Sequence, residues 1–166
     1  IIPSIYRDFN HYRLKSKTNT EEINSIFIEV LVGHLKASSG ETNEQLRLTM
    51  VNDLLDYVHV MPSDSNIVFG VDLNVYTFNE PAFQELIDTS NNIVFADPAN
   101  RLGNWHNNAS FIDMFTQSTR TQSGLGGASG GFDDRFDFVL TSSNMLTNSD
   151  VYYVDNSYQV YGNNAN

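Results

Sequence analysis

The chain has 166 residues, of which 40% are hydrophobic, 12% are aromatic and none is cysteine. This length favours one domain with a real core, and the apolar content argues against disorder throughout. The lack of cysteine excludes disulfides and thiolate chemistry, and no apolar run approaches the roughly 18 residues that cross a bilayer. The net charge of −11 disfavours broad adhesion to nucleic acid or anionic membranes, but it is compatible with a divalent cation that meets a phosphate.

The amino-terminal region predicts a strand and a turn before a second strand. Alternation over residues 9–14 is a weak strand pattern, and the polar residues 17–24 predict a hairpin turn. Ile26–His34 predicts a firm strand, because alternate apolar residues from Ile26 to Val32 share one face.

A helix and another strand follow. Thr42 with Gln45 forms a predicted capping box, and an apolar stripe at helical spacing extends the helix to Val60. The apolar run Ile67–Gly70 predicts a buried strand. A strand, helix and strand in succession form a crossover unit with parallel strands, so His34 and Asp72 are expected at one edge of the sheet.

Asp72 and Asn74 are the first candidate site residues. Side chains at i and i+2 of an extended segment point to the same side, and the carboxyl end of a buried strand is where ligands bind in open α/β sheets. An ordinary turn at the end of a strand contains the same residue types. His34 is open to two interpretations in the same way, as a packing residue or as a catalyst.

The second half of the chain contains shorter predicted elements. Glu80-Pro81 predicts the start of a short helix. Brief strands are predicted over residues 92–97, 110–120, 136–140 and 151–154, and the glycine-rich residues 124–131 predict a flexible loop. Asp137 lies within an apolar strand, so a partner for its carboxylate is expected. Trp105 and His106 lie on a polar loop. Polar loops with a lone aromatic residue are common, but exposed side chains of these types often contact a ligand, so both interpretations stay open.

Three blocks in register resemble a known family. His34-Leu-Lys, the Gly70–Asn74 block and Arg135–Ser142 are similar to motifs of the endonuclease/exonuclease/phosphatase superfamily, which includes deoxyribonucleases and abasic-site endonucleases. Residues 76–81, 103–110 and 116–120 resemble its bacterial, often secreted, branch. The resemblance extends from Arg7 to Tyr161.

The resemblance implies a fold and a domain. It implies an α/β fold, a four-layer sandwich of two mixed sheets, of which residues 1–166 are the carboxyl-terminal portion. The amino-terminal half and the extreme carboxyl terminus are expected to be missing, and localisation is expected to be secreted or periplasmic. The amino-terminal half is therefore an expected partner, without which the isolated chain is expected to be inactive and not independently ordered.

The resemblance also implies roles for particular residues. Asp72 would orient or deprotonate the attacking water, Asn74 would hold the phosphate and that water, and His34 would hydrogen-bond a phosphate oxygen. The implied catalytic residues are His34, Asp72, Asn74 and Asp137, with Asp137 supporting a second histidine. The implied substrate contacts are Asn104, Trp105, His106, Arg120 and Arg135. Asp72 and Asn74 are the implied contacts of a Mg²⁺ ion, or of Mn²⁺ or Ca²⁺.

Three functions remain open at this point. The first is metal-dependent hydrolysis of phosphodiester bonds by a bacterial nuclease acting on DNA or RNA. The second is a related phosphatase or phospholipase, and the third is an inactive interaction domain. The third is kept because groups that the superfamily uses are expected to be missing from the chain, and because Val71 occupies a position that is usually glycine in the superfamily. Valine there is expected to disturb the turn that aims Asp72.

Overall fold

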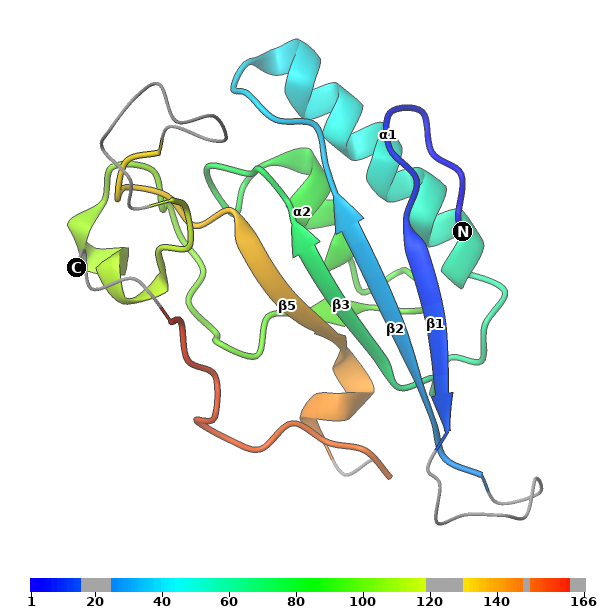
Figure 1. Cartoon of the computed structure of the whole chain (residues 1–166). Coiled ribbons are helices and arrows are strands. Elements are labelled where there is room, and N and C mark those ends of the chain that lie inside the picture. Colours follow the sequence, from blue (N-terminus) through cyan, green and yellow to red (C-terminus); the bar gives the residue numbers. More distant parts are fainter. Residues whose placement is uncertain (16–24, 119–129, 148–149, 162–166) are drawn as a thin grey trace.

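The computed structural model describes residues 1–15, 25–118, 130–147 and 150–161, and one five-stranded mixed sheet organises them (Figure 1). The strands are β1 (Asn10–Lys15), β2 (Phe27–His34), β3 (Ile67–Asp72), β4 (Phe95–Ala96) and β5 (Asp137–Ser142), in the order β1-β2-β3-β5-β4. Only the pair β2–β3 is parallel, as the crossover pattern predicts. The α/β class and the mixed sheet are therefore confirmed. None of the described helices is long and apolar enough to span a membrane.

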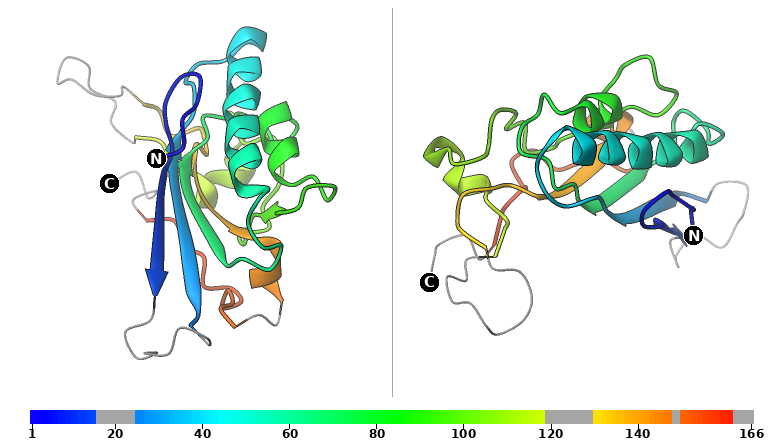
Figure 2. Two further views of the ribbon diagram at one scale, coloured as in Figure 1. Left: turned by 90° about the vertical axis from the view of Figure 1, so that its right-hand side faces the viewer. Right: turned by 90° about the horizontal axis from the view of Figure 1, so that it is seen from above.

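Two helices cover one face of the sheet. Helix α1 (Glu41–Val58) and helix α2 (Pro81–Leu86) lie on the same side (Figure 2). Buried residues of α1 such as Met50 and Leu54 belong to one core cluster with residues of the strands and α2. Gly40, with a φ of 99°, is the residue before α1, and no side chain caps this helix. The predicted capping box at Thr42 is therefore wrong, whereas α2 starts at proline as expected.

The opposite face of the sheet is open among the described residues. The strand register puts Tyr12 opposite Val30, Val32 opposite Gly70, and Gly70 opposite Val139, so these side chains share a face. Tyr12 is 54% exposed, Val32 41% and Val139 47%. Both views of Figure 2 show helices α1 and α2 on the other side of the sheet from this face. An apolar sheet face without a covering layer is typical of a contact surface.

The shorter predicted elements are partly wrong. Residues Ala109–Met114 form a 3₁₀ helix (η2) instead of a strand, because the Asn108 side chain accepts a hydrogen bond from the Ser110 N–H and turns the chain. Residues 151–154 form no strand, and the strand predicted over 92–97 is reduced to β4. A second 3₁₀ helix, η3, covers Ser143–Leu146. The predicted turn at 17–24 and most of the predicted glycine-rich loop lie outside the described residues.

Candidate functional site

Three adjacent strand ends bring His34, Asp72 and Asp137 together. His34 and Asp72 end β2 and β3 and are register partners, and Asp72 is the register partner of Asp137, where β5 begins. His34 Nε2 lies 3.4 Å from Asp72 Oδ2. Alternation along the strands puts all three on the open face, the face that Val32, Gly70 and Val139 share. The predicted shared edge of the sheet is therefore present in the structure.

Asn74 follows in a tight turn. The Asn74 N–H donates to Asp72 Oδ1 at 3.0 Å, and its side-chain Nδ2 donates to the Leu35 carbonyl oxygen at 3.3 Å. Asn74 has a φ of 53°, a left-handed conformation that asparagine tolerates well. Asn74 thus reaches the site from a turn and not from an extended segment, which corrects the predicted geometry. Val71 continues β3 as a buried residue opposite Phe138, so the disturbed turn expected before Asp72 is absent.

The environment of the two carboxyl groups favours their protonated forms. Burial raises the pKa of Asp72, the negative charge of Asp137 raises it further, and His34 opposes both effects. Burial also raises the pKa of Asp137, against a hydrogen bond from Thr116 and the charge of His34. Asp137 keeps a large exposed surface, so contact with water limits this increase. A carboxylate whose pKa lies above its ordinary value is a better general base near neutral pH.

A buried ion pair connects the two loops that leave these strands. Arg47 of α1 donates to the carbonyl oxygens of Lys36 at 2.9 Å and Ser38 at 2.8 Å, in the loop after His34. The same guanidinium donates twice to Glu80 Oε2, at 2.9 and 2.6 Å. Glu80 Oε1 accepts the Tyr76 N–H at 2.7 Å, in the loop after Asp72. Arg47 is 0% exposed and Glu80 6%, so this pair holds both loops in place from inside the protein.

Trp105 and Arg135 are core residues, which corrects the prediction that they bind substrate. Trp105 is 0% exposed, packs on Phe83 and Phe138, and donates from Nε1 to the Arg101 carbonyl oxygen at 2.9 Å. Arg135 is also 0% exposed and forms two hydrogen bonds with the Asp97 carboxylate, at 2.8 and 2.9 Å. Neither side chain is free to reach a ligand.

The other predicted substrate contacts have different outcomes. Asn104 is exposed and pairs with Thr77 in an isolated bridge, and the His106 side chain is 47% exposed. The His106 ring packs edge-on against Tyr76, with the centroids 5.2 Å apart. Arg120 lies outside the described residues. Asn104 and His106 therefore remain predicted contacts.

His106 also belongs to a group that the sequence analysis missed. Its Nδ1 lies 3.0 Å from both carboxylate oxygens of Asp134, and Asp133 is adjacent. One ligand atom from each of the three residues lies within 4.8 Å of the other two, which is close enough to hold a metal ion. The pair Asp133-Asp134 was the available sequence signal, but the 26 residues between His106 and Asp133 concealed the contact.

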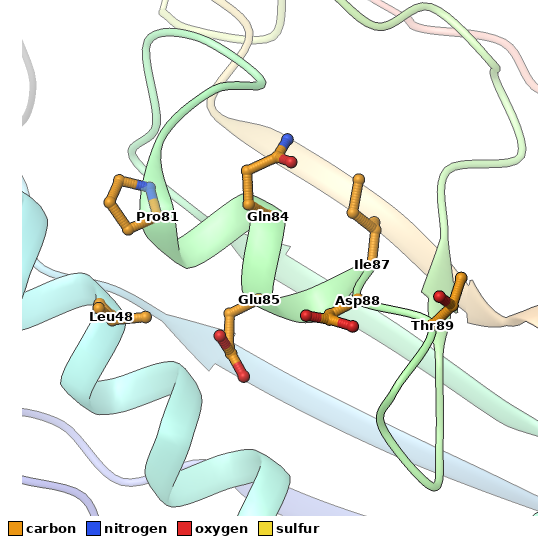
Figure 3. Close-up of a pocket in the computed structure, with 7 residues that line it drawn as sticks. All are labelled: Leu48, Pro81, Gln84, Glu85, Ile87, Asp88 and Thr89. Atoms are coloured by element: carbon orange, nitrogen blue, oxygen red, sulfur yellow. The ribbon is translucent and has the colours of Figure 1, made fainter.

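Two hollows differ in their relation to the site. One of about 510 Å³ is lined by Ser39, Tyr76 and His106 among others, and so lies beside the loops that follow His34 and Asp72. Another of about 500 Å³ lies against α2 (Figure 3). Its lining includes Glu85 and Asp88, whose charges disfavour an anionic ligand. The hollow beside Tyr76 also has two acidic lining residues, Glu44 and Glu80, so charge does not separate the two hollows. Its position beside the loops that follow His34 and Asp72 is what makes it the better candidate for a substrate.

Comparisons with known proteins give similarities at low identity. No family model and no curated protein matches the chain. The human Nocturnin catalytic domain with bound sulfate matches with 18% identity and a TM-score of 0.44, over 86% of this chain and 45% of that chain. Beta toxin from Staphylococcus aureus matches with 15% identity and a TM-score of 0.44, over 82% of this chain and 43% of that chain. D. rerio TDP2 complexed with a single-strand DNA product matches with 13% identity and a TM-score of 0.41, over 85% and 56%.

The endonuclease/exonuclease/phosphatase superfamily therefore stays the family that the sequence motifs resemble, since each of these identities is below 25% and each TM-score is below 0.5. The chain spans about half the length of the solved structures it matches. Identities below 25% and TM-scores below 0.5 do not determine an activity, because function depends on the side chains of a site and not on the fold.

Proposed function

We propose that this chain forms part of the catalytic edge of a divalent-metal-dependent phosphodiesterase, a nuclease that acts on DNA or RNA. The observation that carries the proposal is the meeting of His34, Asp72 and Asp137 at three adjacent strand ends, with Asn74 in the next turn. Hydrolysis of a phosphodiester needs an oriented water, a base and positive charge near the phosphate oxygens. These residue types can orient the water and act as the base, and His34 can supply part of the positive charge.

The donor set fits a hard divalent cation. Asp72 and Asp137 face each other across β3 and β5, so two carboxylates that repel one another lie side by side. A cation held by their oxygens would relieve this repulsion, and Mg²⁺ is commonly bound by one or two carboxylates with water and phosphate oxygens. Mn²⁺ and Ca²⁺ accept the same oxygen ligands. The bound ion would supply positive charge next to the phosphate.

The chain's own residues account for orientation and proton transfer. Asp72, with its raised pKa, would accept a proton from the attacking water. Asn74 donates its Nδ2 hydrogen to Leu35, which leaves its side-chain oxygen to accept a hydrogen bond from that water. The His34 side chain is 50% exposed, so its imidazole can donate to a phosphate oxygen. Tyr76 and His106, beside the neighbouring hollow, would contact the rest of the substrate.

The open sheet face indicates where a partner of this site would pack. His34, Asp72 and Asp137 lie at the end of the same face that exposes Tyr12, Val32 and Val139. A layer packed on this face would therefore also reach the site and could add a metal ligand. We propose that the amino-terminal half of the same domain is this layer, and that the protein is secreted or periplasmic.

A substrate panel tests the proposed function. The full-length protein is expected to cleave plasmid DNA or RNA with added Mg²⁺, and Asp72→Asn and His34→Gln are expected to lower the rate at least 100-fold. Asp113→Asn, far along the chain in an exposed ion pair, is the matched control and should keep the wild-type rate. Cleavage of a phosphomonoester or a phospholipid instead would assign the same residues to a phosphatase or phospholipase. No hydrolysis of any of these would favour an interaction domain.

A further inference from the structure

The strongest feature outside the proposed hydrolytic edge is the group of His106, Asp133 and Asp134. His106 lies on the loop after β4, and the two aspartates precede β5. The ligand atoms of the group lie within 4.8 Å of one another. A zinc ion bound at about 2.0–2.2 Å keeps neighbouring ligand atoms roughly 3–4 Å apart. Small rotations of these side chains would therefore bring all three to one ion.

The residues that the structure describes do not balance the charges of this group. Among the described residues, no lysine or arginine forms an ion pair with Asp133 or Asp134. The neighbouring Arg135 points to Asp97 instead, with which it forms a buried pair. The Asp134 side chain is only 6% exposed, so water compensates little of its charge. Two adjacent carboxylates with only an imidazole beside them leave net negative charge, which a cation would neutralise.

Surrounding residues hold the three side chains in place. His106 Nε2 lies 2.8 Å from the Asn107 side-chain amide, so the ring presents Nδ1 to the carboxylates. Gln117 Oε1 accepts the backbone N–H groups of Asp133 and Asp134, and its Nε2 donates to the Asp133 carboxylate. Hydrogen bonds of this kind orient histidine and carboxylate ligands in metal sites. In the structure the Asn107 Nδ2 group faces Nε2 and Nδ1 donates to Asp134, so metal binding at Nδ1 requires the other tautomer of His106, with its proton on Nε2 and the Asn107 amide turned to accept it.

We propose that His106, Asp133 and Asp134 form a second metal site, specific for a transition-metal ion such as Zn²⁺. Imidazole nitrogen favours Zn²⁺ over Mg²⁺ or Ca²⁺, which prefer oxygen ligands only. Three protein ligands leave a fourth position for water. The ligands of this site are separate from His34, Asp72 and Asp137, but His106 is also a proposed substrate contact, so the site is tested by Zn²⁺ binding and not by cleavage. The competing explanation is an ordinary ion pair between His106 and Asp134 with no affinity for metal.

Zn²⁺ titration followed by calorimetry tests the site in the whole chain. The expected result is one Zn²⁺ bound per chain, with at least tenfold weaker binding of Mg²⁺ and Ca²⁺. His106→Gln, Asp133→Asn and Asp134→Asn should each weaken Zn²⁺ binding at least tenfold, whereas Asp72→Asn, His34→Gln and Asp113→Asn should leave it unchanged. Histidine NMR signals should show zinc contact at Nδ1 of His106. Fluorescence of the buried Trp105 checks that each variant is folded.

The outcomes separate this site from the proposed active edge. Zn²⁺ binding that is lost in His34→Gln or Asp72→Asn but kept in His106→Gln would overturn the proposal and place the ion at the hydrolytic edge. A folded chain that binds no Zn²⁺ would also overturn it and leave an ion pair. Neither result would alter the test of phosphodiester hydrolysis, which is made with Mg²⁺.

Discussion

Removing Arg47 should destabilise the protein strongly, because it leaves a buried carboxylate without a partner. In Arg47→Met, Glu80 loses both hydrogen bonds from the guanidinium while it remains 6% exposed. Breaking a buried ion pair in this way lowers the free energy of unfolding by about 3–5 kcal/mol. The carbonyl oxygens of Lys36 and Ser38 lose their donor as well, although both residues are near enough to solvent to bind water instead.

Urea unfolding followed by tryptophan fluorescence measures this loss. Trp105 is the only tryptophan and is 0% exposed, so its emission reports on the core. The control Asp113→Asn breaks an exposed pair with Arg101 and should change the free energy of unfolding by less than about 1 kcal/mol. Arg47→Met combined with Glu80→Leu removes both charges and should be more stable than Arg47→Met alone.

The pH dependence gives a second test of the same pair. Burial raises the pKa of folded Glu80 above its ordinary value of 4.5, and removal of Arg47 should raise it further. Folded Glu80 then binds a proton more tightly than unfolded Glu80. Arg47→Met should therefore be most stable below pH 4.5 and lose stability as the pH rises through the raised pKa. A loss below about 1 kcal/mol at neutral pH would refute the role assigned to the pair.

Two further predictions follow from the sheet. Asp137→Asn removes a negative charge beside Asp72, so the pKa of Asp72 should fall, which carboxyl NMR titration can measure; an unchanged or higher pKa would contradict the proximity of the two groups. Gly33→Ala should lower the free energy of unfolding by about 1–3 kcal/mol, because its Cβ would lie 2.5 Å from a ring carbon of buried Phe9. Gly70→Ala is the matched control on the open face, where a Cβ meets nothing within 4 Å, and should change stability by under about 0.5 kcal/mol. Equal losses for the two glycines in urea unfolding would show that the two faces are not packed as described.

Local patterns predicted the strands that position the site. The apolar run at Ile67 and the alternation after Ile26 gave β3 and β2, and the helix between them required parallel pairing. That pairing was sufficient to place His34 beside Asp72. Antiparallel pairing sets Asp137 opposite Asp72, and among the described residues His34 is the histidine that affects its charge. The second histidine expected beside Asp137 stays a prediction.

Contacts between distant residues could not be predicted in the same way. Arg135 is a substrate contact implied by the resemblance, whereas the structure pairs it with Asp97, which is 38 residues away and is joined to it only by the fold. Trp105 appeared exposed on a polar loop, but Phe83 and Phe138 enclose it from two other elements. The alternation over 110–120 resembles a strand, yet one side-chain hydrogen bond at Asn108 is enough to start a 3₁₀ helix there.

The central claim is that Asp72 acts as the base at a metal-dependent phosphodiester site. The most direct measurement is the pH dependence of Mg²⁺-dependent DNA cleavage by the full-length protein, in wild type and in Asp72→Asn. The rate should rise with pH as Asp72 loses its proton, and Asp72→Asn should lose both the cleavage and this rise. A wild-type rate that falls as the pH rises would contradict the claim. Cleavage by Asp72→Asn at the rate of the wild type would also contradict it.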